Sequence, residues 1–461
     1  MTTITTLQGG TQVFAWEKVL RDVPGVRKVV LGTLDHQKVV AKFFMHHAKG
    51  PLHQQTELIN HDELVRGGVL TPRVIYADKD AEDHPVIIYE CIEQTADSHA
   101  VWNSPCADTR LSFLKTVVGI LALEHIQGLC QHDLHPSNFI IVHEKCYTLD
   151  PASIDVYKGG VPTLACLENL GELCAQIAIP FYEDYRYAVE TYCHIRKWSC
   201  DEQMLRIIEA WQNNYREKRE KKYVEKLFRG CTRILYFQSF FKVIACWREK
   251  YTPAMQAMLS NIEAAIKTGA FLKAGNSNTV VKVPVEDYQV VVKRYNLKNT
   301  RQRIKRFFGQ NKAKKSWMNA GRLFFHHVPT PMPIALVEHK WGPFRRVVYF
   351  ISEYVEGQTL KTFLKQQNLT KQEKTFIFSE IKSLFKSLQR LRLSHGDMKA
   401  TNFLVTKNSV MMTDMDAMQR HTSLRTFKKA QARDIKRFLK NFHGNAEYVE
   451  AFTEVLKDVV Q

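Results

Sequence analysis

A short polar motif occurs twice in this chain with the same internal spacing, and it limits the possible folds more than any other feature. In the first copy, Asp133 is followed by Asn138 five residues later and by Asp150 after twelve more. The second copy repeats both spacings with Asp397, Asn402 and Asp414. Asp and Asn at this distance are common in loops, but a second full copy is a poor fit to chance. We therefore predict an internal repeat of one domain.

The residue types of this motif are those that phosphoryl transfer from ATP requires. One Asp accepts the proton of the acceptor hydroxyl, while an Asn and a second Asp hold the Mg²⁺ ions that neutralise the triphosphate. By this pattern Asp133 and Asp397 are predicted to be catalytic. The predicted metal ligands are Asn138, Asp150, Asn402 and Asp414. The alternative is that these side chains only cap tight turns, which the recurrence of the whole pattern makes a weaker explanation.

Each motif is preceded by a run of β-branched residues that ends on a lysine, Lys42 in the first copy and Lys293 in the second. A lysine in this place contacts the α and β phosphates of ATP and pairs with a carboxylate on the following helix. Glu57, fifteen residues after Lys42, is favoured for this pairing over Glu63. The second copy has Ser316 at the aligned position, so another group has to position Lys293. Lys42, Glu57 and Lys293 are the predicted cofactor-binding residues.

Neither copy has the glycine-rich G-x-G-x-x-G loop that covers the phosphates in protein kinases. Gly25 is the only glycine in a predicted loop before the first lysine, and the segment 274–279 of the second copy contains a single glycine. This difference counts against an ordinary protein kinase. Residues 86–91 and 349–354 are predicted to be buried strands that run into a hinge, where backbone groups could meet an adenine.

The repeated order of strand lysine, hinge, apolar helix, loop and metal Asp predicts an α+β fold of two tandem bilobal protein-kinase-like domains. Each domain should have a small sheet-rich lobe and a helical lobe. We place the first domain at 1–250, with a helical extension at its C-terminal end. A helical linker is predicted at 251–268, and the second domain at 269–461.

The charge of the chain indicates an anionic partner. Lys and Arg number 65 against 47 Asp and Glu, which gives a net charge of +18. Such a surface suits a nucleic acid, an anionic membrane or a phosphorylated glycolipid, unless it is merely a solvated basic surface. The densest basic segment, 298–315, includes Phe307 and Phe308 and is expected to lie on an anionic surface.

Other features of the composition point to the cytoplasm. No apolar run reaches membrane-spanning length and the start of the chain does not have the pattern of a signal peptide, so we expect neither. The ten cysteines include no CxxC pair and no metal-ligand spacing, as expected of reduced thiols.

Several segments of the second copy resemble the lipopolysaccharide kinase family, the Kdo and heptose kinases of the bacterial envelope. In family order they are Val-Lys-Arg-Tyr-Asn at 292–296, Lys-Ser-Trp-Met-Asn-Ala at 315–320, Thr-Pro-Met-Pro at 330–333, His-Gly-Asp at 395–397 and Arg-Asp-Ile-Lys-Arg-Phe at 433–438. The resemblance is specific over 270–445 and looser over 26–180.

This resemblance implies ATP and Mg²⁺ as cofactors and a cytoplasmic enzyme that is peripheral at the inner membrane. It implies a heptose or Kdo hydroxyl of the lipopolysaccharide core, or of a lipid-linked sugar, as the acceptor. The implied partners are this acceptor and the anionic membrane surface, and no nucleic acid is expected.

The two copies differ beside the catalytic Asp. Two residues before it, the first copy has Gln131 and the second has His395, the usual kinase residue. Two residues after it, the first copy has His135, as in small-molecule and sugar kinases, and the second has Lys399, as in Ser/Thr kinases. We expect both copies to bind nucleotide and favour the second as the active kinase. A protein or small hydroxyl acceptor remains an alternative. Another is that one copy, or both, is a pseudokinase that serves as a scaffold in envelope assembly, although the retained metal ligands speak against this for both copies at once.

Overall fold

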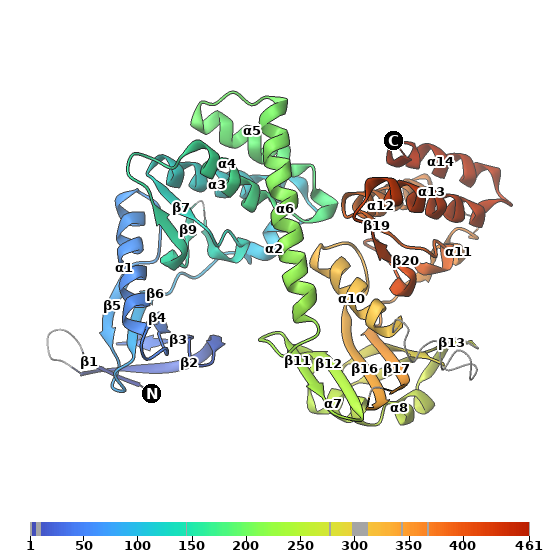
Figure 1. The fold of residues 1–461 in the computed structure, drawn as a ribbon, viewed down its shortest axis with the longest axis horizontal. Helices are drawn as coiled ribbons and strands as arrows, with labels where there is room; N and C mark the ends of the chain where they lie inside the picture. Colours follow the sequence, from blue (N-terminus) through green and yellow to red (C-terminus); the bar gives the residue numbers. More distant parts are fainter. Residues whose placement is uncertain are drawn as a thin grey trace. The chain divides into compact units, whose positions relative to one another are not determined.

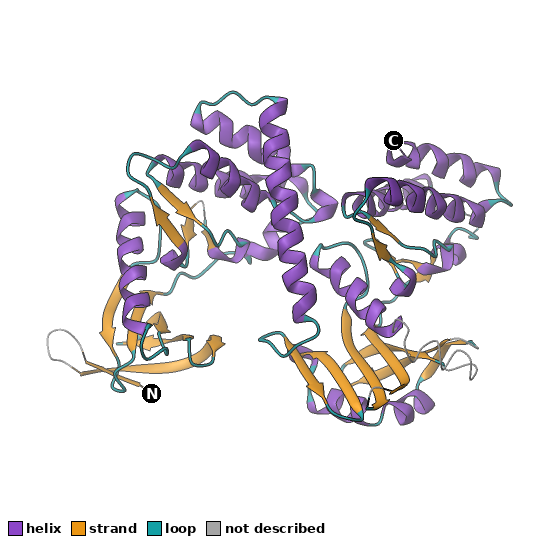
Figure 2. Ribbon diagram, viewed as in Figure 1, coloured by secondary structure: helices purple, strands orange, loops and turns teal. Residues whose placement is uncertain are grey.

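The computed structural model describes residues 2–5, 11–143, 145–275, 278–296, 312–342, 344–366 and 368–460. The chain divides into two compact units. The first consists of Met1–Ile177 and Phe181–Lys218, and the second of Ala178–Pro180 and Arg219–Gln461. Each unit contains an antiparallel sheet and a separate group of helices, which confirms the α+β class (Figures 1 and 2).

The first unit begins with a six-stranded antiparallel sheet in the order β1-β2-β3-β4-β6-β5. Its strands are β1 (Thr2–Thr5), β2 (Thr11–Val23), β3 (Arg27–Leu34), β4 (Gln37–Phe43), β5 (Val74–Lys79) and β6 (Pro85–Glu90). Alternate residues of a strand face opposite sides. Val39, Ala41 and Phe43 therefore join one apolar cluster, while Lys42 faces the other side. On that other side Ile87 and Tyr89 of β6 pack near helix α1 (Gly50–Arg66).

The helical part of the first unit follows β6. It contains α2 (Ser98–Trp102), α3 (Ala107–Ile126), α4 (Thr163–Cys174), α5 (Asp184–Arg196) and the start of α6 (Glu202–Lys226). Short elements between α3 and α4 carry the polar motif: β7 (Leu129–Gln131), η1 (Pro136–Asn138), β8 (Phe139–Val142), β9 (Lys145–Thr148), η2 (Pro151–Ser153) and β10 (Ile154–Val156). The β8–β9 hairpin accounts for the interval between Asn138 and Asp150.

The second unit has a seven-stranded sheet in the order β11-β12-β16-β17-β15-β14-β13. The strands are β11 (Ile234–Gln238), β12 (Lys242–Trp247), β13 (Ala270–Ala274), β14 (Asn278–Val285), β15 (Tyr288–Tyr295), β16 (Pro333–Trp341) and β17 (Phe344–Glu353). The order β13-β14-β15-β17-β16 repeats the order β2-β3-β4-β6-β5 of the first unit. Helices α7 (Pro253–Ser260) and α8 (Ile262–Thr268) cover one face of this sheet, and α10 (Lys312–Phe325) packs against the other.

The boundary between the units differs from the predicted one. Residues 251–268 form α7 and α8 within the second unit, where Met255, Leu259 and Ile262 are buried in the core of the sheet. Strand β12 pairs with β16, so residues 234–247 extend the second sheet and are not part of the first domain. The predicted linker is therefore a packed helix pair, because its apolar positions serve the core of the second unit.

The helical part of the second unit contains α11 (Leu360–Phe363), α12 (Lys371–Arg390), α13 (Leu424–Leu439) and α14 (Ala446–Val460). Its motif lies on β19 (Leu393–Ser394), η5 (Ala400–Asn402), β20 (Phe403–Val405), β21 (Val410–Met412), η6 (Met415–Ala417) and β22 (Gln419–Arg420), and β18 (Gln358–Thr359) pairs with β20. The side chain of Phe438 on α13 packs against Phe385, Phe403, Phe442 and Phe452. These contacts hold α13 against α12, α14 and strand β20, which follows the polar motif.

Two predicted segments contain residues that lie outside the described part of the chain. Of the basic segment 298–315, only Lys312–Lys315 is described, and it begins α10. Residues 276 and 277 of the segment 274–279 are also outside the described part. Among the helices that the structure describes, none is both long and apolar enough to span a bilayer.

Candidate functional site

In the first unit a buried lysine lies between two carboxylates. Lys42 Nζ on β4 donates to Glu57 Oε1 on α1 at 2.7 Å and to Asp150 Oδ1 at 2.8 Å. The Tyr89 hydroxyl donates to the same Glu57 oxygen at 2.8 Å and so fixes its orientation. The competing candidate Glu63 instead pairs with Arg66 on the exposed side of α1. The contact expected of the helix carboxylate is thus made by Glu57.

Asp150 is held as an anion by the cations around it. The backbone of Asp150 is in the left-handed region, with a φ of 56°, at the start of η2. Burial alone would raise the pKa of Asp150, but Lys42, Arg27 and Arg21 outweigh burial and hold this pKa below its ordinary value. Arg27 Nη1 is 3.5 Å from Asp150 Oδ1. A metal ligand must be deprotonated, so this environment suits the predicted role.

The loop of the first unit is held by backbone and amide contacts. Asn138 Nδ2 donates to the Asp133 carbonyl at 2.8 Å, and the Asn138 carbonyl accepts from Leu149 N at 2.8 Å. Behind the loop, Asn169 Nδ2 donates to the Gln131 carbonyl at 2.8 Å, and its Oδ1 contacts the ring of His125 at 3.0 Å. Asp133 itself is exposed to solvent.

Lys42, Glu57, Asn138 and Asp150 line a common cavity of about 730 Å³ in the first unit. Its apolar lining comes from the sheet and from the loop region: Val29, Leu31, Val40, Ile140 and Leu149. Its polar lining includes Lys42, Glu57, Asn138 and Asp150, and the hinge contributes Tyr89–Ile92. Two apolar walls beside a hinge suit a flat base, and a polar end with a lysine suits phosphates. The catalytic candidate Asp133 is not among the lining residues.

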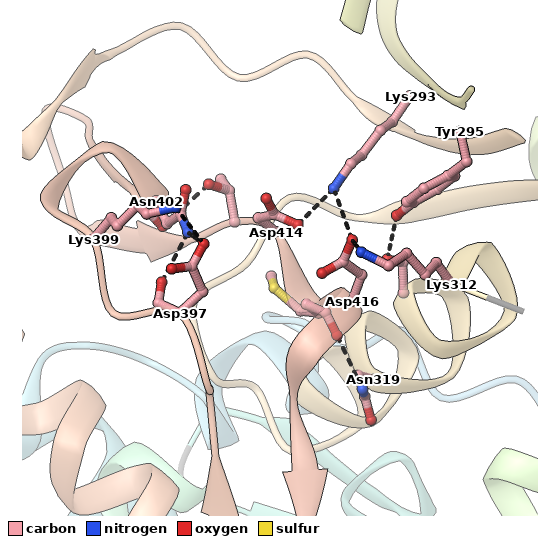
Figure 3. Close-up of polar contacts among 12 residues, drawn as sticks. Lys293, Tyr295, Lys312, Asn319, Asp397, Lys399, Asn402, Asp414 and Asp416 are labelled. Atoms are coloured by element: carbon pink, nitrogen blue, oxygen red, sulfur yellow. Dashed lines mark hydrogen bonds and ion pairs between the residues drawn. The ribbon is translucent and has the colours of Figure 1, made fainter. Parts of the chain in front are cut away.

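In the second unit the strand lysine is also held by two carboxylates, but both come from residues 414–416, the segment that begins with the predicted metal ligand Asp414 (Figure 3). Lys293 Nζ is 2.5 Å from Asp414 Oδ1 and 3.7 Å from Asp416 Oδ2. Asp416 Oδ2 is also 3.5 Å from Nζ of Lys312, the first residue of α10. Burial alone would lower the pKa of Lys293, but Tyr295 and the two carboxylates raise it above its ordinary value. Lys293 is therefore a cation in this site.

The catalytic candidate of the second unit has two cationic neighbours. Asp397 Oδ2 accepts from Lys399 Nζ at 3.0 Å, and Asp397 Oδ1 is 2.5 Å from Arg437 Nη2 on α13. Burial would raise the pKa of Asp397, but these two charges lower it. Asn402 Nδ2 donates to the Asp397 carbonyl at 2.9 Å, and Asp434 accepts from two backbone N–H groups just before Asp397 at 2.7 and 3.0 Å.

The hydrogen bonds around the metal Asp are equivalent in the two units. Asn60 of α1 donates to the carbonyls one and four residues after Asp150, at 2.9 and 3.1 Å. Asn319 of α10 donates to the carbonyls one and four residues after Asp414, at 3.0 and 3.1 Å (Figure 3). In both units the N–H before the metal Asp donates to the carbonyl of the motif Asn at 2.8 Å. Both motifs thus have the same local architecture.

The equivalent hydrogen bonds of the two units explain how Gln131 can stand where the second unit has His395. Gln131 Nε2 donates to the Leu149 carbonyl at 3.1 Å, and the His395 ring contacts the Thr413 carbonyl with Nε2 at the same distance. Leu149 and Thr413 both directly precede the metal Asp. An amide N–H therefore replaces the imidazole N–H, and the altered residue still makes the contact.

Sequence reasoning did not identify several residues of these sites: Asn60, Asn319, Asp416, Asp434 and Arg437. The sequence could have identified Asn60 and Asn319, because they repeat at the same place in the two copies: Asn60 lies three residues after Glu57, and Asn319 lies three residues after the aligned Ser316. Arg437 and Asp434 lie within the segment 433–438 that carries the family resemblance. Nothing in the spacing of the motif distinguishes Asp416 from an ordinary loop carboxylate.

Most of the second unit matches the sequence model of one protein family. Residues 267–458 match the sequence model of the Lipopolysaccharide kinase (Kdo/WaaP) family, so this part of the chain carries one domain of that family. A solved structure, "WaaP in complex with acyl carrier protein", is similar at 19% sequence identity with a TM-score of 0.34. The similarity covers 44% of this chain and 89% of that one. No curated protein sequence matches the chain.

Proposed function

We propose that the chain is an ATP-dependent kinase that phosphorylates a sugar hydroxyl of the lipopolysaccharide core, on heptose or Kdo. The family match over residues 267–458 supports the reaction class. The observation that carries the proposal is the group formed by Lys293, Asp397, Asn402 and Asp414, which gather a strand lysine, a loop base and two oxygen ligands in one unit. The enzyme would act at the cytoplasmic face of the inner membrane, where such an acceptor is built.

The donor set fits ATP with Mg²⁺. Mg²⁺ prefers oxygen ligands, and Asn402 and Asp414 supply an amide and a carboxylate oxygen. Bound Mg²⁺ would supply charge neutralisation on the triphosphate. Lys293 would hold the α and β phosphates. Asp397 would accept the proton of the sugar hydroxyl, and Lys399 would stabilise the charge that develops on the transferred group.

We also propose that the first unit is a second kinase-like domain that binds nucleotide. The equivalent hydrogen bonds of Asn60 and Asn319, the repeated strand order and the cavity beside Lys42 support this part. Lys42, Glu57, Asn138 and Asp150 would hold ATP and Mg²⁺ there, and Asp133 would be its base. The second unit is favoured as the active kinase, because Lys399 and Arg437 orient its base.

The experiment compares Asp397→Asn and Asp133→Asn for phosphate transfer from labelled ATP to purified core lipopolysaccharide. Loss of the general base should lower the rate about 10²–10⁴-fold. We expect this loss in Asp397→Asn, with nucleotide binding retained. Full activity in Asp397→Asn together with loss in Asp133→Asn would move the reaction to the first unit. Transfer to a protein or small alcohol, and none to core lipopolysaccharide, would overturn the acceptor.

Nucleotide binding is tested separately for each unit with Asp150→Ala and Asp414→Ala. Each substitution removes a predicted Mg²⁺ ligand, so each should weaken Mg·ATP binding in its own unit and leave the fold intact. Calorimetric titration with and without Mg²⁺ measures this change. Unchanged affinity in both variants would contradict the metal assignment.

A further inference from the structure

The two strand lysines are each paired with two carboxylates, but one of these carboxylates occupies a different position in each unit. Lys42 contacts the metal Asp150 and, from the helix, Glu57. Lys293 contacts the metal Asp414 and, two residues further along the loop, Asp416. Charge is thus conserved around the lysine, although the second carboxylate has moved from the helix to the loop.

The reciprocal positions confirm that this is an exchange. Where the first unit has Glu57, three residues before the helix Asn, the second has Ser316. Where the second unit has Asp416, two residues after the metal Asp, the first has Ala152. The equivalent bonds of the helix Asn in each unit fix this alignment independently of the sequence spacing.

We propose that Asp416 is the positioning residue for Lys293 and does in the second unit what Glu57 does in the first. This inference rests on the proposed function, in which both lysines hold the phosphates of ATP. A second carboxylate is needed because Asp414 is the proposed Mg²⁺ ligand and is therefore engaged when the nucleotide is bound. Asp416 then remains as the anion that holds the ammonium group in place.

Asp416 also restores the connection between the strand and the helix. In the first unit Glu57 makes this connection because it is itself on α1. In the second unit α10 contributes a cation instead, and Asp416 Oδ2 lies between Lys312 Nζ at 3.5 Å and Lys293 Nζ at 3.7 Å (Figure 3). In both units these contacts join the strand that carries the lysine, the following helix and the loop that carries the metal Asp. The charge of the helix residue is negative in the first unit and positive in the second. Only 12% of the side chain is exposed in both Lys293 and Asp416, so water screens the contact between them little. Lys312 is half exposed, so its contact with Asp416 is screened more strongly.

The place of the helix carboxylate is filled in the second unit. The Ser316 hydroxyl is 2.7 Å from the Tyr295 hydroxyl, and both side chains are buried. The first unit has Phe44 at the matching strand position, two residues after its lysine, and so has no hydroxyl there. A helix carboxylate transplanted to position 316 therefore needs Tyr295→Phe as well.

The test measures Mg·ATP affinity by calorimetry in a Lys42→Met background, so that binding reports on the second unit. Asp416→Ala should weaken this affinity at least about tenfold, as expected for the loss of a contact to a charged group. In transfer assays the KM for ATP should rise while the KM for the acceptor stays unchanged. Asp287→Ala removes the same charge from an exposed turn of the same unit and should change neither quantity.

Rescue distinguishes positioning from a merely structural role. The triple variant Tyr295→Phe, Ser316→Glu, Asp416→Ala rebuilds the arrangement of the first unit and should recover most of the lost affinity. The reciprocal pair uses a Lys293→Met background, in which Glu57→Ala should weaken binding and the addition of Ala152→Asp should restore it. Ala152 is exposed, so this second transplant does not disturb a core.

The outcomes separate the inference from the proposed function. Normal Mg·ATP affinity in Asp416→Ala, when the unchanged chain binds ATP, would overturn this inference alone. Weak binding in Asp416→Ala that Tyr295→Phe and Ser316→Glu do not restore would also overturn it, and would identify Asp416 as a metal ligand or a structural residue. Failure of Ala152→Asp to restore binding in Glu57→Ala would overturn the claim that the two carboxylate positions are interchangeable. Failure of the unchanged chain to bind ATP would overturn the proposed function and this inference with it.

Discussion

Glu220 is expected to be the most important single charge for the stability of the second unit. Its carboxylate is buried and meets three basic side chains. Glu220 Oε1 is 2.6 Å from Arg322 Nε and 2.5 Å from Arg420 Nη1, and Oε2 is 2.8 Å from His326 Nε2. Arg322 lies on α10 and Arg420 on β22, so one carboxylate joins α6, α10 and β22.

The magnitude follows from the pKa of Glu220. Burial would raise this pKa, but the hydrogen bond and charge of His326 and the charges of Arg322 and Arg420 outweigh burial and lower it to about 2. Relative to an ordinary value of 4.5, this difference corresponds to about 3 kcal/mol of folding free energy. Because the folded-state pKa is depressed, the contribution is present above pH 4.5 and is lost as the pH falls from there towards 2.

The perturbation is Glu220→Gln, which keeps the shape but removes the charge. At pH 7 this variant should lower the free energy of opening of α10 by about 3 kcal/mol, because three basic groups lose their shared anion. Hydrogen exchange read by mass spectrometry on α10 peptides measures this local free energy even if the two units unfold separately. In acid unfolding, the difference between wild type and variant should shrink as the pH falls below 4.5 and disappear only near pH 2.

The matched control is Glu225→Gln, which neutralises an exposed carboxylate one and a half turns further along the same helix. This control should leave exchange in α10 unchanged. The reasoning is refuted if Glu220→Gln exchanges like the wild type at pH 7. It is also refuted if the loss of stability is the same at pH 3 as at pH 7, since a titrating carboxylate cannot give that result.

Three further predictions concern the proposed sites. Asn60→Ala and Asn319→Ala each remove two hydrogen bonds to buried carbonyls and should each lower stability by about 1–3 kcal/mol, measured as thermal unfolding of the respective unit. Gln131→His should retain nucleotide binding in the first unit, whereas Gln131→Ala should weaken it, as titration calorimetry would show. Four basic residues of the segment 298–315 are to be neutralised together: Arg303, Lys305, Arg306 and Lys312. Binding to anionic vesicles should then weaken by about 1 kcal/mol per charge, and an affinity independent of salt would contradict this.

Sequence spacing predicted two local features, the hairpin between Asn138 and Asp150 and the contact of Glu57 with Lys42, for a physical reason. The interval between Asn138 and Asp150 is a tight hairpin, whose length is determined by its own strands and turn. A helix has 3.6 residues per turn, so Glu63, six residues after Glu57, lies on a different face of α1. Glu57 therefore contacts Lys42 while Glu63 pairs with Arg66 on the exposed side. Such relations depend on neighbouring residues, and a linear pattern records them.

The parts that sequence reasoning did not predict depend on contacts between distant segments. Strands β11 and β12 belong to the second sheet only because β12 pairs with β16, about ninety residues later. Nothing in the composition of residues 234–247 distinguishes them from an extension of the first domain. In the same way, the contact between Asp416 and Lys293 depends on the turn η6 and the placement of β15, which the spacing of the motif does not encode.

The residues that are equivalent in the two units and those that differ fall on different sides of the proposed reaction. The lysine, the metal Asp, the motif Asn and their hydrogen bonds are alike, and all of them lie on the side that would hold nucleotide. The acceptor side differs, since the first unit has His135 and an exposed Asp133, while Lys399 and Arg437 orient the base of the second. Conservation of nucleotide binding with divergence beside the base is expected if the two units handle different acceptors, or if the first unit binds nucleotide without transferring phosphate. Exchange of His135 and Lys399 between the units would distinguish these cases. If the two units handle different acceptors, the acceptor preference should move with the exchanged residue; if the first unit does not transfer phosphate, it should not.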